Sequence, residues 1–232
     1  CVSLYFIIYR RVNMSVCGIS GKNEEQKELI RAVLDKNIDL IVVQGALGSG
    51  KTIVVTACAL ELCIGKTGFD NIVISRPMIP DEGEDIGFLP GDELEKIGPY
   101  LSGFHCAAQE LDSLSSKMNY YQEMIMGESS DCITTAKSLA TVKGASYSHS
   151  ILILDEAQCA TLSQLKKWIG RSSRHSKVVI LGDVGQKSNE KNDGFERLID
   201  IAENSGKDFI KVIRLTKVER SRLAEFADGI GS

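Results

Sequence analysis

A glycine-rich segment near residue 50 carries the residue types and the spacing that phosphate binding requires. It consists of Gly45, Ala46, Leu47, Gly48, Ser49, Gly50, Lys51 and Thr52, and it fits the pattern Gly-x4-Gly-Lys-Ser/Thr of a P-loop. Its glycines allow the backbone to point N–H groups at phosphate oxygens, and the N-terminus of a following helix adds partial positive charge. We expect Lys51 to reach the β- and γ-phosphates and the Thr52 hydroxyl to bind Mg²⁺.

The segments on either side of this loop support the same interpretation. An apolar run at residues 39–44 predicts a buried parallel strand, and residues 52–62, rich in Ala, Leu and Val, predict a helix. The alternative is a glycine-rich strand-to-helix turn that carries Lys-Thr by chance, but at average glycine usage the pattern arises by chance in only about one chain of this length in a hundred. The order strand, loop, helix therefore predicts a nucleotide site.

A second apolar run, at residues 151–154, ends in two acidic residues, Asp155 and Glu156. We expect Asp155 to hold the Mg²⁺ shell and Glu156, which faces the other way, to position and deprotonate an attacking water. Strands often end in solvated acids, so this pattern gains its meaning from the P-loop. Small-molecule kinases and GTP switches generally need no Glu at this position, so the pair favours ATP hydrolysis.

A third apolar run, at residues 178–182, also delivers polar groups at its carboxyl end, where open α/β sheets bind ligands. Gln186 is a candidate to hydrogen-bond the γ-phosphate or the attacking water. Asp183 could bridge to the metal shell, and the alternative for this residue is an ordinary Gly-Asp turn.

Alternation of apolar runs with helical patterns predicts an α/β fold, with a mostly parallel sheet and helices on both faces. The predicted strands are residues 40–44, 71–75, 132–135, 151–154, 178–182 and 209–215. Helices at 93–114 and 117–126 are expected to form an elaboration in the middle of the chain. We place strand 71–75 between the strands that precede the P-loop and Asp155. Such an additional strand is typical of the ATPase branch that contains helicases and ring motors.

The 232 residues are enough for one α/β domain. We expect an N-terminal extension at residues 1–20, an ATPase domain at 21–227 and a tail at 228–232. Because the chain begins with Cys1 rather than Met, we predict that Met14 is the natural start.

Composition limits the classes of partner and compartment. The net charge of -4 argues against a globally basic surface for nucleic acid, but it allows a local one. Seven cysteines without a C-x-x-C pair predict reduced thiols and a cytoplasmic location, and three isolated histidines predict no structural metal. No apolar run is long enough to span a membrane.

Asp-Glu-Ala-Gln at 155–158 and Gly-Asp-x-x-Gln at 182–186 resemble the core of superfamily one helicases. More closely, the chain resembles the PhoH family of phosphate-starvation-inducible ATPases. The segments that carry this resemblance, which runs from about Gln26 to about Arg222, are Ser75-Arg76-Pro77, Gly87-Phe88-Leu89-Pro90-Gly91, Lys96–Leu101 and Lys143-Gly144-Ala145-Ser146. It implies a RecA-like domain that binds and hydrolyses ATP and is often associated with RNA metabolism. The departure at Ala46-Leu47 should be harmless, whereas those at Lys143 and Cys159 put fine coupling in doubt, not nucleotide binding.

Two residues allow two interpretations each. Gln26 could read the adenine edge, as a Gln ahead of the P-loop does in helicase-like proteins, or it could complete a helix capping box with Asn23. Arg76 could contact phosphate or nucleic acid, or it could pair with the acidic loop at residues 81–85.

Arg220 is the best candidate for an arginine finger, which contributes about 10³–10⁵-fold in rate. The chain is too short to hold a second ATPase-like domain, so the finger would come from a neighbouring subunit of a homo-oligomeric ring such as a hexamer. The alternative is a solvated basic helix start.

A further group of basic residues could form a nucleic-acid face with Trp168 as a stacking group. Its members are Lys166, Lys167, Arg171, Arg174, Lys177, Lys211, Arg214 and Lys217. The alternative is a solvated helix face with Trp168 turned into the core.

Two hypotheses for function follow. The first is an ATP-driven motor or remodeller, helicase-like, that acts on RNA or single-stranded DNA. The second is a nucleotide-dependent regulatory or assembly ATPase without translocation. A small-molecule kinase is disfavoured by Asp155-Glu156 and by the lack of a visible lid.

Overall fold

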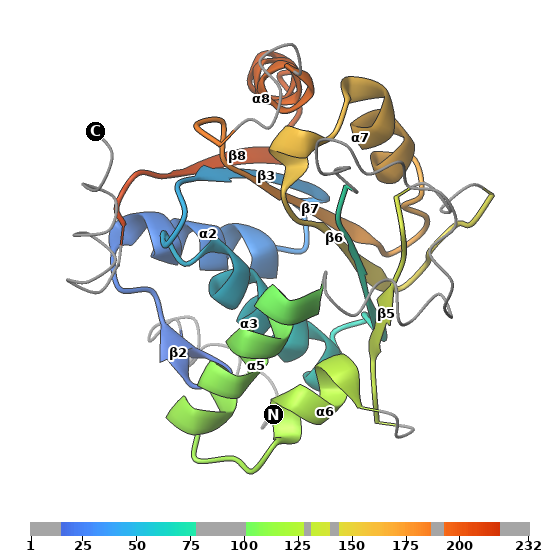
Figure 1. The fold of residues 1–232 in the computed structure, drawn as a ribbon. Helices are drawn as coiled ribbons and strands as arrows, with labels where there is room; N and C mark the ends of the chain where they lie inside the picture. Colours follow the sequence, from blue (N-terminus) through green and yellow to red (C-terminus); the bar gives the residue numbers. More distant parts are fainter. Residues whose placement is uncertain (1–14, 78–100, 128–130, 140–143, 187–192, 219–232) are drawn as a thin grey trace, which may run out of the picture.

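A six-stranded sheet forms the centre of the molecule in the computed structural model, which describes residues 15–77, 101–127, 131–139, 144–186 and 193–218 (Figure 1). The strands are β3 (Leu40–Gly45), β4 (Asn71–Ser75), β5 (Thr134–Ala136), β6 (Ser150–Leu154), β7 (Lys177–Gly182) and β8 (Ile210–Leu215). They lie in the order β5-β4-β6-β7-β3-β8, and every neighbouring pair is parallel. The predicted α/β class is confirmed, and the predicted strands agree with the observed ones to within one or two residues.

One part of the predicted topology is wrong. The strand between β3 and β6 is β7, whereas β4 (residues 71–75) lies on the far side of β6 and pairs with β6 and β5. Both strands are apolar and buried along most of their length, so the hydrophobic pattern did not distinguish a place in the middle of the sheet from one nearer its edge. The expected arrangement, with one strand between the P-loop strand and the Asp155 strand, is nevertheless present.

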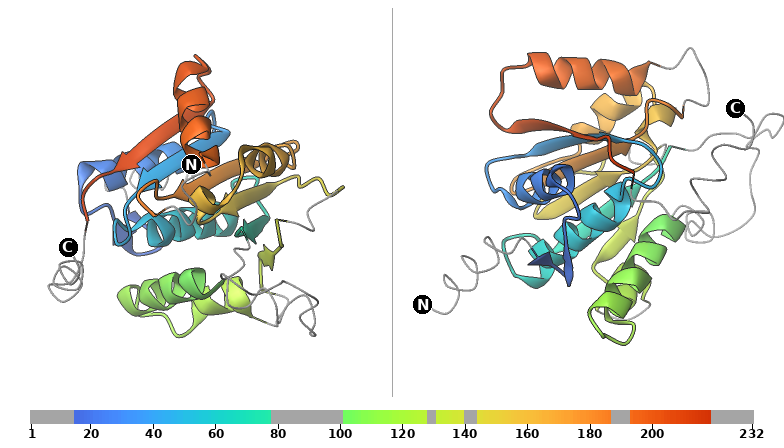
Figure 2. Two further views of the ribbon diagram at one scale, coloured as in Figure 1. Left: turned by 45° about the horizontal axis from the view of Figure 1, so that its top comes forward. Right: turned by 90° about the vertical axis from the view of Figure 1, so that its left-hand side faces the viewer.

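Helices cover both faces of the sheet (Figure 2). One face carries α2 (Glu24–Leu34) and α3 (Lys51–Ile64), and the other carries the 3-10 helix η2 (Ala157–Cys159), α7 (Leu162–Ile169) and α8 (Gly194–Asn204). Successive strand residues point to opposite faces, so Ile41 and Val43 pack on the α2–α3 side while Leu40 and Val42 pack on the α7–α8 side. Two hydrophobic cores therefore share one sheet.

The predicted helical elaboration is present as α5 (Ser102–Leu114) and α6 (Tyr120–Met126). These two helices contact each other, and α5 packs on α3, so they form a further layer outside the sheet (Figure 2). Phe104 and Leu111 are the buried large residues of α5. Because α3 begins in the P-loop, this elaboration supports the helix that the loop feeds.

A two-stranded antiparallel hairpin precedes α2 and was not expected. It pairs β1 (Ser15–Val16) with β2 (Ile19–Ser20), and its turn residues Cys17 and Gly18 have φ of 45° and 87°, as a type I′ turn requires. Val16 and Cys17 are buried, and the Cys17 N–H donates to Glu61 of α3 at 3.1 Å. These residues belong to the segment that the sequence assigned to an N-terminal extension, and they pack on the domain core.

Several predicted features lie outside the described residues. They are Met14 and the segment before it, the loops at 81–85 and 87–91, the first part of helix 93–114, Lys143, Arg220 and the tail at 228–232.

The described cysteines, Cys17, Cys58, Cys63, Cys106, Cys132 and Cys159, are free thiols. Burial raises the pKa of the Cys63 thiol to about 12, and that of Cys58 also lies far above its ordinary value. No helix in the described ranges is long and apolar enough to cross a bilayer.

Lys177 stands at the start of the central strand β7 and is buried, which is unusual for a lysine. Its Nζ donates to the carbonyl oxygens of Asp35, at 2.8 Å, and of Ile38. These carbonyls follow the C-terminus of α2, where a cation is favourable. Burial lowers the pKa of Lys177 to about 8, but the ammonium still fixes α2 to the sheet.

We expect Lys177→Met, which keeps the aliphatic stem and removes the ammonium, to lower the free energy of unfolding by about 1–3 kcal/mol, because two buried carbonyls lose their donor. Urea unfolding would measure this loss. Lys211→Met on β8 is the matched control, because Lys211 is exposed and forms only a surface pair with Glu28 at 3.1 Å. The control should change stability by less than about 0.5 kcal/mol. A Lys177→Met protein as stable as the wild type would show that the ammonium does not stabilise the fold.

Candidate nucleotide-binding site

The predicted functional segments meet at one edge of the sheet, because the carboxyl ends of parallel strands lie together. The P-loop follows β3, Asp155 and Glu156 follow β6, and the turn with Asp183 and Gln186 follows β7. The amino-terminal turn of α2 lies against the P-loop from the side. This edge is the candidate site.

The P-loop has the backbone that its glycines predict. Gly48 and Gly50 have φ of 81° and 82°, a conformation that residues with a Cβ adopt with strain. Helix α3 starts directly after Gly50, at Lys51, so its N-terminus faces the loop. A Cβ at Gly45 would lie 2.8 Å from Ser49 Oγ and 2.9 Å from Leu215 Cβ, so the strand end also has no room for a side chain.

Lys51 and Thr52 begin α3 and point to two different parts of the site. Lys51 Nζ donates to the carbonyl oxygens of Gly45 at 2.5 Å and Ala46 at 3.0 Å, within its own loop. Thr52 Oγ1 lies 3.5 Å from Asp155 Oδ2, at the limit of a hydrogen bond. The structure therefore brings together the two residues that the sequence proposed as metal ligands, from segments 103 residues apart.

Asp155 is a half-buried residue at the end of β6. Its backbone N–H donates to Ser75 O at 3.0 Å, which extends the β4–β6 ladder to this residue. Burial raises the pKa of Asp155, and the neighbouring charge of Glu156 raises it further. The charges of Lys51 and Arg76 act in the opposite direction, without cancelling this effect. The charged form of Asp155 is therefore disfavoured here, and a nearby cation would favour it.

Glu156 leaves the strand with left-handed backbone angles, φ 55° and ψ 41°. One carboxylate oxygen, Oε2, accepts a hydrogen bond from Gln158 Nε2 at 2.6 Å. The other, Oε1, lies 3.6 Å from the guanidinium of Arg76. The predicted partner loop of Arg76, residues 81–85, is outside the described residues. The pair with Glu156 was missed because it depends on β4 lying next to β6.

Asp183 joins the turn after β7 to the P-loop. Its Oδ2 accepts the Leu47 N–H at 3.2 Å, and its Oδ1 accepts the Gly185 N–H at 2.9 Å, so it also closes the Gly-Asp turn. Its own N–H donates to Gln158 Oε1 at 3.0 Å. Gln186 follows in the same turn and is exposed, and its backbone N–H bonds to Asp183 O at 3.1 Å.

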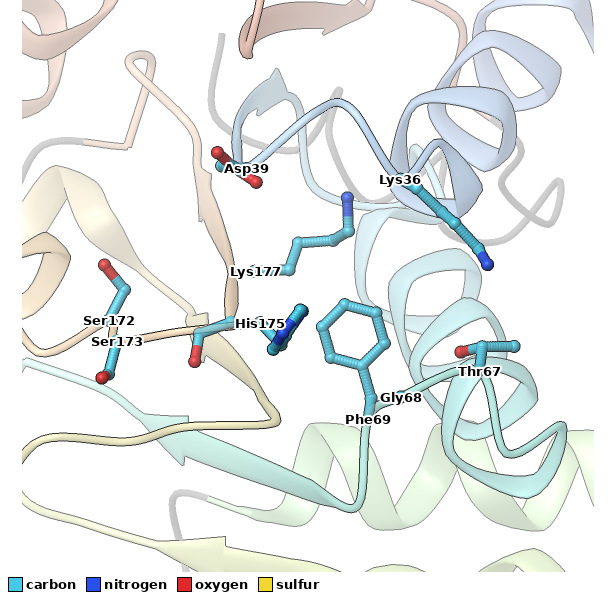
Figure 3. Close-up of a pocket in the computed structure, with 10 residues that line it drawn as sticks. Lys36, Asp39, Thr67, Gly68, Phe69, Ser172, Ser173, His175 and Lys177 are labelled. Atoms are coloured by element: carbon cyan, nitrogen blue, oxygen red, sulfur yellow. The ribbon is translucent and has the colours of Figure 1, made fainter.

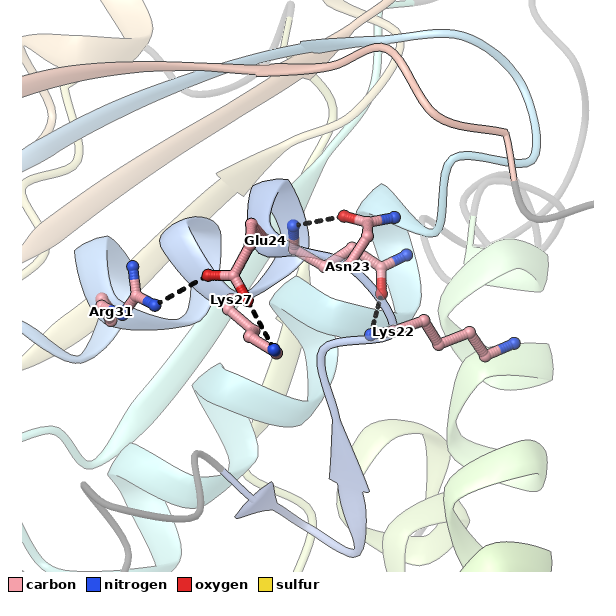
Figure 4. A network of polar contacts seen from close by, with 6 residues as sticks. Lys22, Asn23, Glu24, Lys27 and Arg31 are labelled. Atoms are coloured by element: carbon pink, nitrogen blue, oxygen red, sulfur yellow. Dashed lines mark hydrogen bonds and ion pairs between the residues drawn. The ribbon is translucent and has the colours of Figure 1, made fainter.

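Gln26 lies in the first turn of α2 and is only 4% exposed. Asn23 caps the helix by accepting the Gln26 N–H at 2.9 Å, as the capping interpretation predicts. The Gln26 Oε1 accepts the Lys22 N–H at 2.9 Å, and its Nε2 donates to Ser49 O in the P-loop at 3.0 Å. Figure 4 shows this turn, with Glu24 paired to Lys27 and Arg31 on its outer face.

Glu25, beside Gln26, was not singled out from the sequence. Its carboxylate accepts the N–H groups of Thr216 at 2.7 Å and Lys217 at 3.1 Å, together with the Thr216 hydroxyl at 2.5 Å. The Thr216 hydroxyl is the main cause that lowers the pKa of Glu25. The first turn of α2 thus holds both the P-loop and the segment that follows β8.

The basic group with Trp168 does not form one face. Trp168 is 0% exposed, which confirms the alternative that places it in the core, and Lys177 is buried. Lys211 pairs with Glu28 on α2, whereas Arg214 pairs with Glu203 on α8. Because α2 and α8 cover opposite faces of the sheet, these two cations point away from each other.

A cavity of about 310 Å³ lies at the opposite edge of the sheet, where the strands begin (Figure 3). Four of its polar side chains bond to the backbone. Thr67 donates to Leu62 O, Ser172 to Ile169 O and Ser176 to Tyr147 O, while Lys177 donates at the end of α2. The cavity lies away from the candidate site, at the other end of the strands.

Known proteins have similar sequences over most of this chain. The chain is 32% identical over 207 residues to a PhoH-like protein of Mycobacterium leprae, covering 88% of this chain and 56% of the relative. It is also 32% identical over 169 residues to protein PhoH of Escherichia coli K12, covering 72% of this chain and 45% of the relative. The chain thus spans about half the length of the curated relatives it matches.

Solved structures support the fold. The large terminase of bacteriophage HK97 superposes with a TM-score of 0.53 at 18% identity, covering 84% of this chain and 39% of the terminase. This likeness confirms the RecA-like P-loop architecture. The profile of the PhoH family, described as PhoH-like protein, matches residues 18–228. Because that match extends over nearly the whole chain, the chain belongs to the PhoH family.

Proposed function

We propose that this domain binds ATP with Mg²⁺, hydrolyses it, and couples hydrolysis to action on RNA or single-stranded DNA. The observation that carries the proposal is the approach of the Thr52 hydroxyl to the Asp155 carboxylate at 3.5 Å, beside Lys51 and Glu156. One P-loop cation, two oxygen ligands and a carboxylate base are the groups that a nucleotide-hydrolysing site needs.

Thr52 and Asp155 fit Mg²⁺, since hydroxyl and carboxylate oxygens are the ligands it prefers and the Asp155 charge is poorly solvated. When bound, Mg²⁺ would neutralise charge that develops on the phosphates. Lys51, whose Nζ now bonds to carbonyls of its own loop, would turn to the β- and γ-phosphates. Glu156 would accept a proton from the attacking water, and Gln186, in the turn after β7, would contact the γ-phosphate.

Nucleic acid as the coupled partner is supported by the resemblance of residues 155–158 and 182–186 to helicase motifs and by the strand β7 between β3 and β6. The second candidate is a regulatory or assembly ATPase with slow hydrolysis. Two observations favour it: Arg76 and Gln158 both contact Glu156, and the basic residues lie on different faces of the sheet. For both candidates we propose a cytoplasmic homo-oligomer in which Arg220 acts on a neighbouring subunit.

The first prediction separates the two candidates. We expect single-stranded RNA or DNA to stimulate ATP hydrolysis, and we expect the stimulation to fall steeply with salt, because phosphate contacts release counterions. Lys51→Ala should abolish hydrolysis with and without nucleic acid. Phosphate-release assays at several salt concentrations measure both effects. If no nucleic acid changes the rate of an active enzyme, the motor is excluded and the assembly ATPase remains.

The second prediction concerns Asp155. A carboxyl whose pKa is raised on folding binds more protons in the folded than in the unfolded state, so its contribution to stability falls as the pH rises through and above its ordinary range. We therefore expect Asp155→Asn to raise the Tm of the metal-free protein at neutral pH, with the gain shrinking on acidification. The same variant should lose the Tm increase that MgATP gives the wild type.

Thermal unfolding from acid to neutral pH, with and without MgATP, tests this second prediction. Asp208→Asn is the matched control, because Asp208 is exposed and the charge change is identical. If metal-free Asp155→Asn has a lower Tm than the wild type at neutral pH, the charge of Asp155 does not destabilise the fold. If MgATP still raises the Tm of this variant, Asp155 is not a metal ligand.

The third prediction tests the shared site. Arg220→Ala should reduce ATP hydrolysis by about 10³-fold or more if the residue stabilises transition-state charge. Mixing Arg220→Ala with Lys51→Ala subunits should restore part of the rate, because some interfaces then combine an intact P-loop with an intact Arg220. Hydrolysis is measured across mixing ratios. No recovery at any ratio would rule out action in trans.

A further inference from the structure

The Glu156 carboxylate is engaged on both oxygens before any ligand is present. Gln158 Nε2 donates to Oε2 at 2.6 Å, and the Arg76 guanidinium lies 3.6 Å from Oε1. A general base must present an oxygen to the water whose proton it takes. In this arrangement, Arg76 competes with such a water for Oε1 of Glu156.

The two partners differ in their freedom to move. Gln158 is 4% exposed, and its Oε1 also accepts the Asp183 N–H at 3.0 Å, so its amide is fixed between β6 and β7. The Arg76 and Glu156 side chains are 35% and 29% exposed. A separation of 3.6 Å is too long for a good hydrogen bond, which leaves a partly solvated ion pair. Arg76 is therefore the partner that can leave.

The position of Arg76 indicates what could displace it. Arg76 directly follows β4, at the sheet edge that carries the nucleotide site, and its head reaches solvent. Guanidinium binds phosphate with two parallel hydrogen bonds, a better geometry than its present contact with Glu156. A chain of phosphates offers this partner at high local concentration.

We propose that Arg76 is a latch on Glu156, which a phosphate of single-stranded RNA or DNA opens by taking the guanidinium away. Gln158 keeps the released carboxylate in place through Oε2, so that Oε1 becomes available to the attacking water. This inference rests on the proposed ATP hydrolysis and explains how it would be regulated. Without nucleic acid, hydrolysis is slow because Arg76 is paired with the base, Glu156. Arg76 and Gln158 act as positioning residues, since they work through Glu156.

The decisive variant is Arg76→Gln, which removes the charge and keeps a polar side chain. Without nucleic acid we expect its kcat to rise about two- to five-fold, the range that loss of a partly exposed ion pair corresponds to, with KM for ATP unchanged. Nucleic acid should then add little further stimulation. Arg76→Lys, which keeps the charge, should stay near the wild type. The double variant Arg76→Gln, Glu156→Gln should not show the rise in kcat, because it lacks the carboxylate that Arg76 would otherwise release.

Arg197→Gln on α8 is the matched control, since Arg197 forms only an exposed pair with Asp193 at 4.0 Å. It should leave kcat and stimulation unchanged. A basal kcat in Arg76→Gln that is equal to or below that of the wild type, with ATP binding intact, overturns the latch and leaves the proposed function standing. If the wild type binds ATP no more tightly than Lys51→Ala does, the proposed function itself is overturned.

Discussion

The site depends on the parallel register of β3, β7, β6 and β4. Gln44 lies opposite Gly182, Ile180 opposite Leu154, and Leu154 opposite Ser75. Each strand therefore ends at nearly the same level, and the residue after each end enters a common space. A shift of one residue in any of these pairs would turn that strand's side chains to the other face. Close packing of both faces against the helices opposes such a shift, because it would exchange the side chains that fill the two cores, so the cores determine where Asp155 and the P-loop meet.

The sequence predicted the local parts of this site well. The P-loop, the helix after it and the strands before Asp155 and Asp183 follow from patterns within about ten residues, where glycine freedom and apolar runs decide the structure. The order of the strands did not follow, because β4 and β7 carry equally apolar sequences. That single uncertainty concealed the pair between Arg76 and Glu156, which needs β4 beside β6. Contacts of Glu25 with Thr216 and Lys217 did not follow from the sequence for another reason, since they join segments 191 and 192 residues apart.

Several features of the site oppose stability in the ligand-free protein. Burial disfavours the charged form of Asp155, Glu156 has left-handed backbone angles, and Lys51 donates to carbonyl oxygens of its own loop. A ligand with phosphates and a divalent cation would favour the charged form of Asp155 and would offer Lys51 an anionic partner. Nucleotide binding should therefore organise this edge, whereas the opposite edge, where Lys177 holds the end of α2, remains independent of the ligand.

The first turn of α2 connects the nucleotide site with the C-terminal part of the chain. Gln26 holds the Ser49 carbonyl of the P-loop, and the adjacent Glu25 holds Thr216 and Lys217. Two neighbouring residues on one rigid helix thus contact the loop that binds phosphate and the segment that precedes Arg220. A movement of the P-loop on nucleotide binding would act on α2 through Gln26, and the short bonds of Glu25 would carry it to residue 217. If Arg220 serves a neighbouring subunit, this turn is one described connection between the two halves of a shared site, and the pairing of Gly45 with Leu215 at the ends of β3 and β8 is another.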